Sequence, residues 1–470
     1  RIMENTVIST LIMNILFKRG GFRVENAREA ALNIISDALK SNRYQSLDPN
    51  KEININLSDK RDKALAQEIS YGVIERKNTL DYILKQYVTR SIDKIDIAVL
   101  NIMRIGLYQL LYLDRIPPSA AVYESVNLAK KYSNSGAAKM VNAVLRSFLR
   151  NNGSYKLPPK KDRVTYLSII YSHPKWLVKK WLNEFGYDFT VGLLEADNIR
   201  LPLTVRANVL KMEPRYLLKK LKNEGVSAEK GNYIEEAIQL KGIGGLENLR
   251  SYGEGLFYIQ DEASMLVSHV LDPQAGEFIM DVCSAPGGKT THIAELMKNS
   301  GRLLARDVYA HKLDIVNQNA SRLGDSIIET QVFDATKTDY ELLGKVDRVL
   351  VDAPCSGLGT IRHRPDIRWS KRICDIKKIS EVQQNILSSS AVYVKTKGIL
   401  VYSTCTVEKE ENIDVIKKFL KRNNDFELIN FKDLIPPGLV TGDASNGYIT
   451  LYPSLNKTDG FFIAKMRRKG

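Results

Sequence analysis

The chain has 470 residues, enough for about three domains, and its 44% hydrophobic content supports real apolar cores. A net charge of +15 and a pI near 9.3 favour a polyanionic partner, most simply nucleic acid, although a generally lysine-rich proteome would produce the same excess. Four cysteines without paired spacing, five scattered histidines and the lack of a membrane-length apolar run argue against a disulfide framework, a zinc site and a transmembrane segment. We therefore expect a cytoplasmic protein without a bound metal or a membrane anchor.

The first 23 residues fit no targeting signal. Residues 7–17 are mostly apolar and are followed by Lys18 and Arg19. A secretory signal peptide would carry its positive charges chiefly before the apolar stretch and would end in small residues. We interpret residues 1–23 as a non-native or frayed extension.

Residues 24–150 are predicted to be all helix. Apolar side chains recur at helical spacing from the start of this stretch, at Ala27, Ala30, Ala31, Ile34, Ala38 and Leu39. The pair Pro117 and Pro118 interrupts the pattern, and helices over 119–132 and 137–149 complete a bundle. Basic residues gather late in it, at Lys130, Lys131, Lys139, Arg146 and Arg150. They form either an RNA-facing surface or an ordinary solvated helix face, and the pattern does not separate the two.

A linker and a small mixed module come next. Residues 151–163 are rich in Asn, Gly, Ser, Pro and Lys, a composition typical of a linker. Residues 163–257 then combine predicted helices with a strand over 203–207, a helix over 214–223 and short Gly-rich segments. We expect a small α+β module that holds the substrate beside the last domain.

From Tyr258 onward, strand and helix patterns alternate. This alternation predicts a doubly wound, mostly parallel sheet over 258–470. The predicted strands, seven in all, cover residues 278–282, 301–306, 327–333, 346–351, 398–402, 449–452 and 461–465.

The first of these strands leads into a turn made of small residues. The turn consists of Cys283, Ser284, Ala285, Pro286, Gly287, Gly288 and Lys289, and a helix pattern follows it. Two glycines without a Cβ let the backbone bend tightly and approach a ligand closely, and open α/β sheets bind nucleotide-like ligands at such a place. Because position 283 is Cys, the spacing of a Walker phosphate loop fails, and Gly-x-Gly-x-x-Gly fails as well. The pattern favours an adenosyl ligand without phosphates over a tight turn that binds nothing.

Three acids follow the next strands. Asp307 lies 20 residues after Gly287, the spacing expected of a carboxylate that binds ribose hydroxyls. Asp334 is placed to meet an adenine amino group, and Asp352 opens the sequence Asp-Ala-Pro-Cys-Ser-Gly. Three carboxylates also suit a cationic sulfonium ligand. Each acid alone is more often a cap or loop residue, but their recurrence after successive strands indicates one site.

Two cysteines follow neighbouring predicted strands, Cys355 after the fourth and Cys405 after the fifth. The C5 atom of cytosine is too weak a nucleophile to attack a methyl group directly. A thiolate added to C6 makes C5 an enamine carbon, which is nucleophilic, and a second thiol can assist the later elimination. Spacing and chemistry do not decide which cysteine attacks. Cys374 and Cys283 are interpreted as structural, Cys283 merely filling the turn.

These segments together resemble the RNA cytosine-5 methyltransferases, which use S-adenosylmethionine. The resemblance lies in residues 283–289 (CSAPGGK), 352–357 (DAPCSG) and 403–407 (STCTV). Residues 359–369 (GTIRHRPDIRW) are similar to the bacterial B-type branch, which modifies small-subunit ribosomal RNA, and the helical start resembles the NusB-type RNA-binding domain of that branch.

The resemblance implies a multidomain fold and a specific reaction. It implies an all-α NusB-like helical domain over 24–150, a small RRM-like α+β module over 163–257 and a Rossmann-like class I methyltransferase domain over 258–470 with a seven-stranded sheet. The implied reaction moves a methyl group from S-adenosylmethionine to C5 of a specific cytosine in 16S ribosomal RNA through a covalent cysteine–C6 intermediate.

The resemblance also assigns residues. It implies Cys405 as the nucleophile and Cys355 as the helper in product release, with the 283–289 turn, Asp307, Asp334 and Asp352 as cofactor contacts. DNA cytosine methyltransferases use a Pro-Cys cysteine, so Cys355 is the rival nucleophile. Arg306 departs from the family, in which a small or apolar residue usually precedes the acid.

The implied partner is 16S ribosomal RNA, free or in an immature small subunit, bound by a monomer. Two alternatives remain: a transfer-RNA or DNA cytosine-5 methyltransferase, and a non-catalytic RNA-binding assembly factor. The presence of both cysteines and all three acids argues against the latter.

Overall fold

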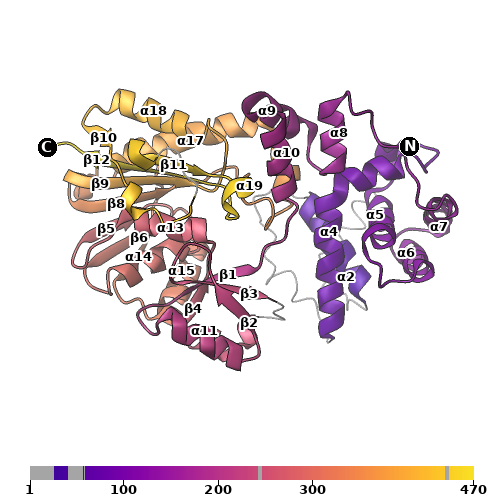
Figure 1. Ribbon diagram of the computed structural model, residues 1–470, viewed down its shortest axis with the longest axis horizontal. Helices are drawn as coiled ribbons and strands as arrows, with labels where there is room; N and C mark the ends of the chain where they lie inside the picture. The colour runs from indigo at the N-terminus through magenta and orange to yellow at the C-terminus, as the bar shows by residue number, and fades with distance from the viewer. Residues whose placement is uncertain (1–25, 41–56, 58, 242–245, 440–443) are drawn as a thin grey trace. The chain divides into compact units, whose positions relative to one another are not determined.

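The computed structural model of the chain describes residues 26–40, 57, 59–241, 246–439 and 444–470. It divides into two compact units, one formed by residues up to 194 together with 364–370, the other by 195–363 and 371–470 (Figure 1). The expected extension over 1–23 lies outside the described residues. No helix in the described ranges is long and apolar enough to cross a bilayer.

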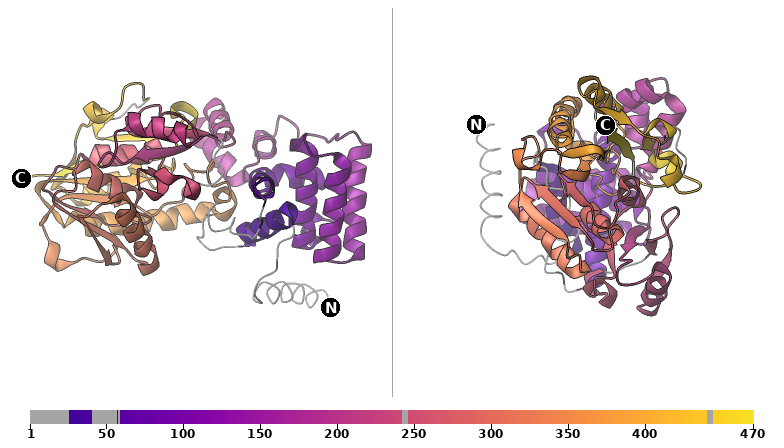
Figure 2. Two further views of the ribbon diagram at one scale, coloured as in Figure 1. Left: turned by 90° about the horizontal axis from the view of Figure 1, so that it is seen from below. Right: turned by 90° about the vertical axis from the view of Figure 1, so that its left-hand side faces the viewer.

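The first unit is helical, as predicted. Its elements are α2 (Ala27–Lys40), α4 (Lys60–Leu84), α5 (Ile97–Tyr112), α6 (Pro118–Tyr132), α7 (Ser135–Arg150), α8 (Arg163–Ile170), α9 (Lys175–Phe185) and most of α10 (Tyr187–Ala196). Helix α5 begins at the N-cap Asp96, and every residue from Ala98 to Gln109 is buried. An apolar helix buried on all sides is the centre of a bundle, and the left view of Figure 2 shows the purple helices of this unit side by side.

A short return segment, residues 364–370, also belongs to the first unit. It contains the single-turn helix α16 (Ile367–Ser370). The Trp369 indole donates to the Ile74 carbonyl at 2.6 Å, and Arg368, which is fully buried, donates to the Ser172 carbonyl at 3.0 Å. The ammonium of Lys77 lies 4.8 Å from the centre of the Trp369 ring. The end of the 359–369 segment is therefore packed into the helical unit.

The second unit begins with a small antiparallel sheet. Its strands are β1 (Leu203–Ala207), β2 (Ser227–Lys230), β3 (Ala237–Lys241) and β4 (Phe257–Ile259), in the order β2-β3-β1-β4. Helix α11 (Pro214–Asn223) buries Leu217 and Leu221 against this sheet, and α12 (Arg250–Gly253) follows. The predicted strand and helix are confirmed, whereas the helices α8 and α9 belong to the other unit.

The large sheet has the order β10-β12-β9-β8-β5-β6-β7, with β11 paired to β12. Its strands are β5 (Phe278–Asp281), β6 (Arg302–Asp307), β7 (Ile328–Val332), β8 (Val346–Asp352), β9 (Val394–Thr404), β10 (Phe426–Leu428), β11 (Tyr448–Leu451) and β12 (Phe461–Arg468). The five central strands β9-β8-β5-β6-β7 are parallel, as predicted, and β12 pairs antiparallel with β9. The predicted seven strands are present, and β10 raises the number in this sheet to eight.

Helices cover both faces of the large sheet. These helices are α13 (Glu262–Leu271), α14 (Gly288–Leu296), α15 (Ala310–Leu323), α17 (Ile373–Ala391) and α18 (Ile413–Arg422), and the short α19 (Pro453–Asn456) precedes β12. Alternate strand residues point to opposite faces: Ile279 and Leu303 pack with α13 and α14, whereas Met280 and Leu304 lie in the core that holds α17 and α18. In Figure 1, α17 and α18 lie above this sheet and α14 and α15 below it.

Candidate active site

The predicted cofactor turn joins β5 to α14. The helix begins at Gly288, so the turn proper covers residues 283–287 and Lys289 lies in the first helical turn. Gly287 has φ +103°, a conformation that L side chains rarely adopt, and a Cβ there would touch Val316 Cα at 3.4 Å. A Cβ on Gly288 would lie 3.0 Å from the Tyr258 ring. Glycine is therefore favoured at 287 by the backbone conformation and at 288 by close packing against Tyr258.

A buried carboxyl fastens both ends of this turn. Asp281, the last residue of β5, accepts hydrogen bonds from the Cys283 amide at 3.3 Å and from the Thr290 hydroxyl at 2.8 Å. Burial raises the pKa of Asp281 to about 7, and the Thr290 hydrogen bond opposes that shift. Asp281 is not among the predicted site residues, although an acid that interrupts an apolar strand immediately before the turn is a recognisable signal.

Asp307 and Asp334 lie where β6 and β7 end. Asp307 is the last residue of β6, and its carboxylate accepts the Tyr309 amide at 3.0 Å. Asp334 follows β7 by two residues, and one of its oxygens accepts both the amide and the hydroxyl of Thr336. The Thr336 hydrogen bonds lower the pKa of Asp334. Each acid accepts the hydrogen bonds of its own turn through one oxygen, and among the described residues no hydrogen bond involves the other.

The unusual Arg306 points away from its neighbour Asp307. Successive strand residues face opposite sides of a sheet. The Arg306 guanidinium donates to Gln331 at 2.8 Å, pairs with Asp339 and lies 4.1 Å from the centre of the Phe333 ring. Its charge is thus neutralised on the other face.

Asp352 already has two partners within the site. Its carboxylate binds the Lys289 ammonium at 2.7 Å and the Ser403 hydroxyl at 2.8 Å. Burial lowers the pKa of Lys289, but the charges of Asp352 and of Cys405 raise it more, so the net shift is upward. This acid therefore holds a cation beside the cysteines.

The turn and the three acids lie at the carboxyl ends of neighbouring strands, as the predicted adenosyl site requires. β7, β6, β5 and β8 are neighbours and parallel, so their carboxyl ends share one edge of the sheet. The buried Ser284 hydroxyl in the turn has no hydrogen-bond partner among the described residues. Val308, next to Asp307, is 53% exposed and offers an apolar surface suited to a flat base.

The two selected cysteines lie together. Cys355 follows β8 and Cys405 follows β9, and these strands are paired so that Asp352 lies opposite Ser403. The two sulfur atoms are 3.2 Å apart, and neither cysteine forms a disulfide. The hydroxyls of Ser356 and Thr406 form a second link at 2.9 Å, and the Gly359 amide donates to the Cys405 carbonyl at 3.1 Å.

The surroundings of the two thiols differ. The hydrogen bond with Cys405, then burial, and then the charges of Cys405, Glu411 and Asp352 raise the pKa of the Cys355 thiol well above its ordinary value. Cys355 therefore keeps its proton and can donate it to the Cys405 sulfur, while the Lys289 ammonium favours negative charge on Cys405.

The remaining cysteines lie in other settings. Burial, followed by the charges of Asp281, Asp352 and Asp307, raises the pKa of Cys283 well above its ordinary value, so it stays a thiol. Cys374 is exposed in the first turn of α17, with its sulfur 3.8 Å from Asp375.

Two buried polar networks attach the small sheet to the cofactor helix α14. In the first, Arg206 of β1, with no exposed surface, donates to the Gly288 carbonyl at 2.7 Å, to the Thr291 hydroxyl at 3.0 Å and to Glu295 at 2.7 Å. The Arg206 guanidinium also lies 5.5 Å from the centre of the Tyr258 ring. This arginine thus fixes the first turn of α14 from behind.

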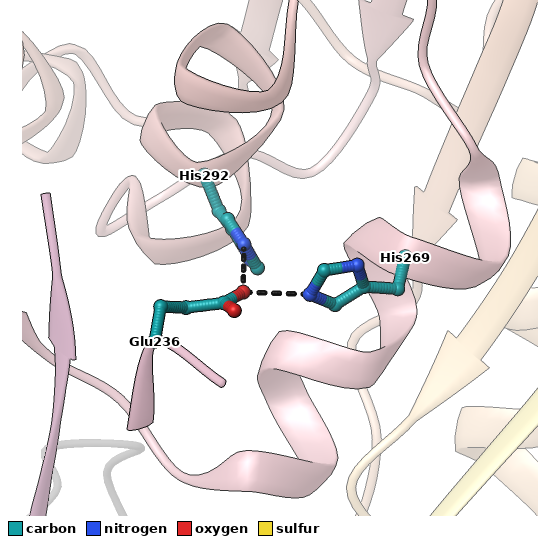
Figure 3. Close-up of side chains that lie close together, drawn as sticks. All are labelled: Glu236, His269 and His292. Carbon is teal, nitrogen blue, oxygen red and sulfur yellow. Dashed lines mark hydrogen bonds and ion pairs between the residues drawn. The ribbon is translucent and has the colours of Figure 1, made fainter. Parts of the chain in front are cut away.

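The second network is the triad Glu236, His269 and His292 (Figure 3). Both imidazole Nε2 atoms contact the same Glu236 oxygen, at 2.6 Å from His269 and 2.9 Å from His292. Burial lowers the pKa of His292 to about 3, so it is neutral and donates its Nε2 hydrogen to the carboxylate. A metal-bound imidazole nearly always donates its other ring N–H, but His292 Nδ1 has no partner among the described residues. The three side chains are instead joined by the two hydrogen bonds that meet on one Glu236 oxygen.

Comparison with known families gives three matches along the chain. The model described as 16S rRNA methyltransferase RsmB/F matches residues 268–467, the NusB family matches residues 25–150, and the RsmF/B-like ferredoxin-like domain matches residues 173–246. The expected NusB-like, small α+β and Rossmann-like methyltransferase folds are thereby confirmed.

Relatives and solved structures agree over most of the length. The chain is 37% identical to the probable ribosomal RNA small subunit methyltransferase B of Bacillus subtilis, covering 95% of this chain and 99% of that one. The crystal structure of PH0851 matches with a TM-score of 0.80 and 26% identity over 93% of this chain and 98% of its own. NSun6 from Pyrococcus horikoshii, solved with the S-adenosylmethionine analogue SFG, matches with a TM-score of 0.56 and 25% identity over 63% of this chain and 98% of its own. The chain therefore belongs to the 16S rRNA methyltransferase RsmB/F family, whose cofactor is S-adenosylmethionine.

Proposed function

We propose that the protein methylates C5 of a specific cytosine in 16S ribosomal RNA through a covalent bond between Cys405 and C6 of the base. The observation that carries this proposal is the pair of thiols 3.2 Å apart at the sheet edge that also bears the turn and the three acids. The substrate class is supported by the B-type relative and by the family match.

Cys405 is the better nucleophile of the two because Cys355 retains its proton and Lys289 stabilises negative charge on Cys405. The Cys405 thiolate gives an electron pair to C6, and the electrons of the C5–C6 double bond become available at C5. When bound, S-adenosylmethionine supplies the methyl group that C5 receives. The 283–289 turn, Asp307 and Asp334 hold this cofactor, and Asp352 keeps Lys289 in place.

Release of the methylated base requires a proton transfer and the breaking of the bond between C6 and the sulfur. A base removes the C5 proton, the C5–C6 double bond re-forms, the C6–sulfur bond breaks, and its electron pair returns to Cys405. Cys355 is close enough to assist this elimination and to return a proton to the departing sulfur.

The parts of the chain divide the work. Residues 24–150 bind RNA, the module over 163–257 positions the substrate, and residues 258–470 hold the cofactor and the thiols. The protein acts as a monomer on free 16S RNA or on an immature small subunit.

Substitution of each thiol tests the assignment. Cys405→Ala is expected to abolish both methyl transfer and any covalent RNA adduct. Cys355→Ala is expected to transfer the methyl group and then retain the RNA as a band that survives a denaturing gel. Cys374→Ala, on the exposed first turn of α17, is the control and should match the wild type. An adduct with Cys405→Ala but none with Cys355→Ala would make Cys355 the nucleophile.

The substrate is tested separately. Bisulfite mapping of ribosomal and transfer RNA, with and without the gene, should show one cytosine in 16S RNA that loses its methyl group. A lost methyl group in transfer RNA would favour the alternative substrate.

A further inference from the structure

The peptide groups on both sides of Cys355 are held by two buried side chains. Gln383 donates its amide N–H to the Pro354 carbonyl at 2.9 Å, just before the cysteine. Glu411 accepts the Ser356 amide N–H at 2.8 Å, just after it. Gln383 also donates to the same Glu411 oxygen at 3.1 Å, so the two side chains form a clamp that is closed behind Cys355.

This clamp is built into the core. Gln383 lies on α17 and Glu411 lies two residues before α18, and neither side chain has exposed surface. The Glu411 backbone is itself fixed, because the Tyr402 hydroxyl donates to its carbonyl at 2.6 Å. The amide of Gln383 has only one useful orientation, since the Pro354 carbonyl and the Glu411 carboxylate both require its N–H donors.

A carboxyl group in this position is costly. Burial raises the pKa of Glu411 to about 7, against the hydrogen bonds from Ser356 and Gln383, and its second oxygen has no partner among the described residues. Burying an incompletely satisfied acid costs stability, and this cost indicates a role for Glu411 beyond packing.

We propose that Gln383 and Glu411 are positioning residues that hold the Cys355 thiol against Cys405 and thereby set the rate of product release. This inference rests on the proposed role of Cys355. Among the described residues, the hydrogen bonds of the two clamp side chains join only each other and the backbone on either side of that cysteine.

The loop of Cys405 has separate supports. Ser403 donates to Asp352, and the Thr404 hydroxyl donates to Asn412. Opening the clamp therefore moves Cys355 while Cys405 keeps its place. Attack and methyl transfer should survive, and elimination should slow, because a misplacement of about 1 Å can cost up to about 100-fold in rate.

The test compares Gln383→Ala and Glu411→Ala with Glu411→Gln. A glutamine oxygen can accept both donors, so Glu411→Gln should keep the clamp and stay within about threefold of the wild type. The control is Gln384→Ala, the next residue on α17, which is also buried but whose amide has no partner among the described residues. Each variant is assayed as the full chain for single-turnover methyl transfer, steady-state turnover and the gel-stable RNA adduct, with cofactor affinity and melting temperature as checks on folding.

Loss of the clamp should affect steady-state turnover but not single-turnover methyl transfer. Gln383→Ala and Glu411→Ala should show near-normal single-turnover transfer, steady-state turnover reduced about tenfold or more, and an accumulated adduct, with unchanged cofactor affinity. Adding Gln383→Ala to Cys355→Ala should change the adduct no further, because both act on the same step.

Each contrary result has its own meaning. Loss of single-turnover transfer, or wild-type turnover without adduct, in a folded Gln383→Ala protein would overturn the clamp. If Cys355→Ala itself accumulates no adduct, the cysteine assignment fails first, and the positioning role in release fails with it.

Discussion

The Asp281 carboxyl accepts two hydrogen bonds that hold the cofactor turn, and burying this ionisable group costs stability. Its pKa is raised from an ordinary 3.8 to about 7, mainly by burial, with Asp352 adding to the shift and Thr290, Lys289 and Cys283 opposing it. A raised carboxyl pKa means that the folded state binds the proton more tightly. The stability contributed by the protonated group is complete below pH 4 and is lost as the pH rises through about 7.

Asp281→Asn should therefore change stability in a pH-dependent way. The asparagine side chain stays neutral at every pH. The free energy of unfolding of the variant, relative to that of the wild type, should therefore rise between pH 4 and 8, by at most about 4 kcal/mol at about 1.4 kcal/mol per pH unit. Urea denaturation across this range measures the difference.

Asp347→Asn is the opposite control. The pKa of Asp347 is lowered, despite burial, by Lys395 and the Phe278 amide, so wild-type Asp347 stabilises the fold above pH 4. The deficit of this variant should shrink as the pH falls below that value. A flat difference for Asp281→Asn from pH 4 to 8 would contradict the raised pKa.

At the residue level, the sequence locates a side chain correctly relative to the sheet where that side chain directly follows a strand, and the role of each such residue stays a prediction. Asp307, Asp352, Cys355 and Cys405 are selected because strand ends of a parallel sheet share one edge. It does not select Gln383, because a glutamine inside a helix pattern carries no local signal and its partner is 28 residues away. The same applies to the two histidines that meet on Glu236, which are scattered along the chain.

At the scale of elements, the parallel strands are predictable because each is a short apolar run between turn residues. Strand β10 is missed because it has only three residues and pairs antiparallel with a strand almost 40 residues later. The start of α14 is shifted to Gly288 because the tight turn needs only five residues before the helix can begin. The grouping of α8 and α9 with the helical unit depends on long-range packing, which sequence periodicity does not contain.

The ion pair between β1 and α14 gives a prediction at this scale. Arg206 and Glu295 are both fully buried, at 0% and 1% exposure, with a 2.7 Å contact. Arg206→Met leaves the Glu295 carboxylate buried without its partner and should lower the free energy of unfolding by about 3–5 kcal/mol. Arg206→Met combined with Glu295→Met removes both charges and should recover much of that loss.

Equilibrium unfolding in urea measures both variants, and calorimetric titration with S-adenosylmethionine shows whether the first turn of α14 still binds. If the pair only anchors the small sheet, the double variant keeps cofactor affinity. If the double variant were less stable than Arg206→Met, the expected cost of leaving Glu295 buried without a partner would be contradicted.

At the scale of the whole molecule, the chain leaves the second unit after His363 and returns at Lys371. Between these points Arg368 and Trp369 pack into the first unit. Deleting the helical domain would therefore remove the hydrogen-bond partners of residues 364–370, and this segment begins only nine residues after Cys355. A test of RNA binding needs surface substitutions in the intact chain.

Helix α7 offers such a surface. Lys139, Arg146 and Arg150 are exposed on one side of it, while Val141, Val144 and Phe148 are buried. Changing these three cations to Gln lowers the net charge from +15 to +12. If they contact phosphates, the slope of log affinity against log salt for 16S RNA should become shallower by about two to three, at about 0.7–0.9 per contact. Cofactor affinity should not change.

A matched variant separates a local surface from total charge. Lys417, Lys418 and Lys421 are exposed on α18 of the second unit, and changing them to Gln gives the same net charge. Fluorescence anisotropy of labelled RNA between 50 and 300 mM salt, roughly the range over which phosphate contacts are screened, compares the two variants. Counterions are released where cations contact phosphates, so cations outside the contact surface should not change the slope. Equal slopes in the two variants would therefore attribute RNA affinity to overall charge. A shallower slope confined to the α7 variant would locate the RNA on the helical unit.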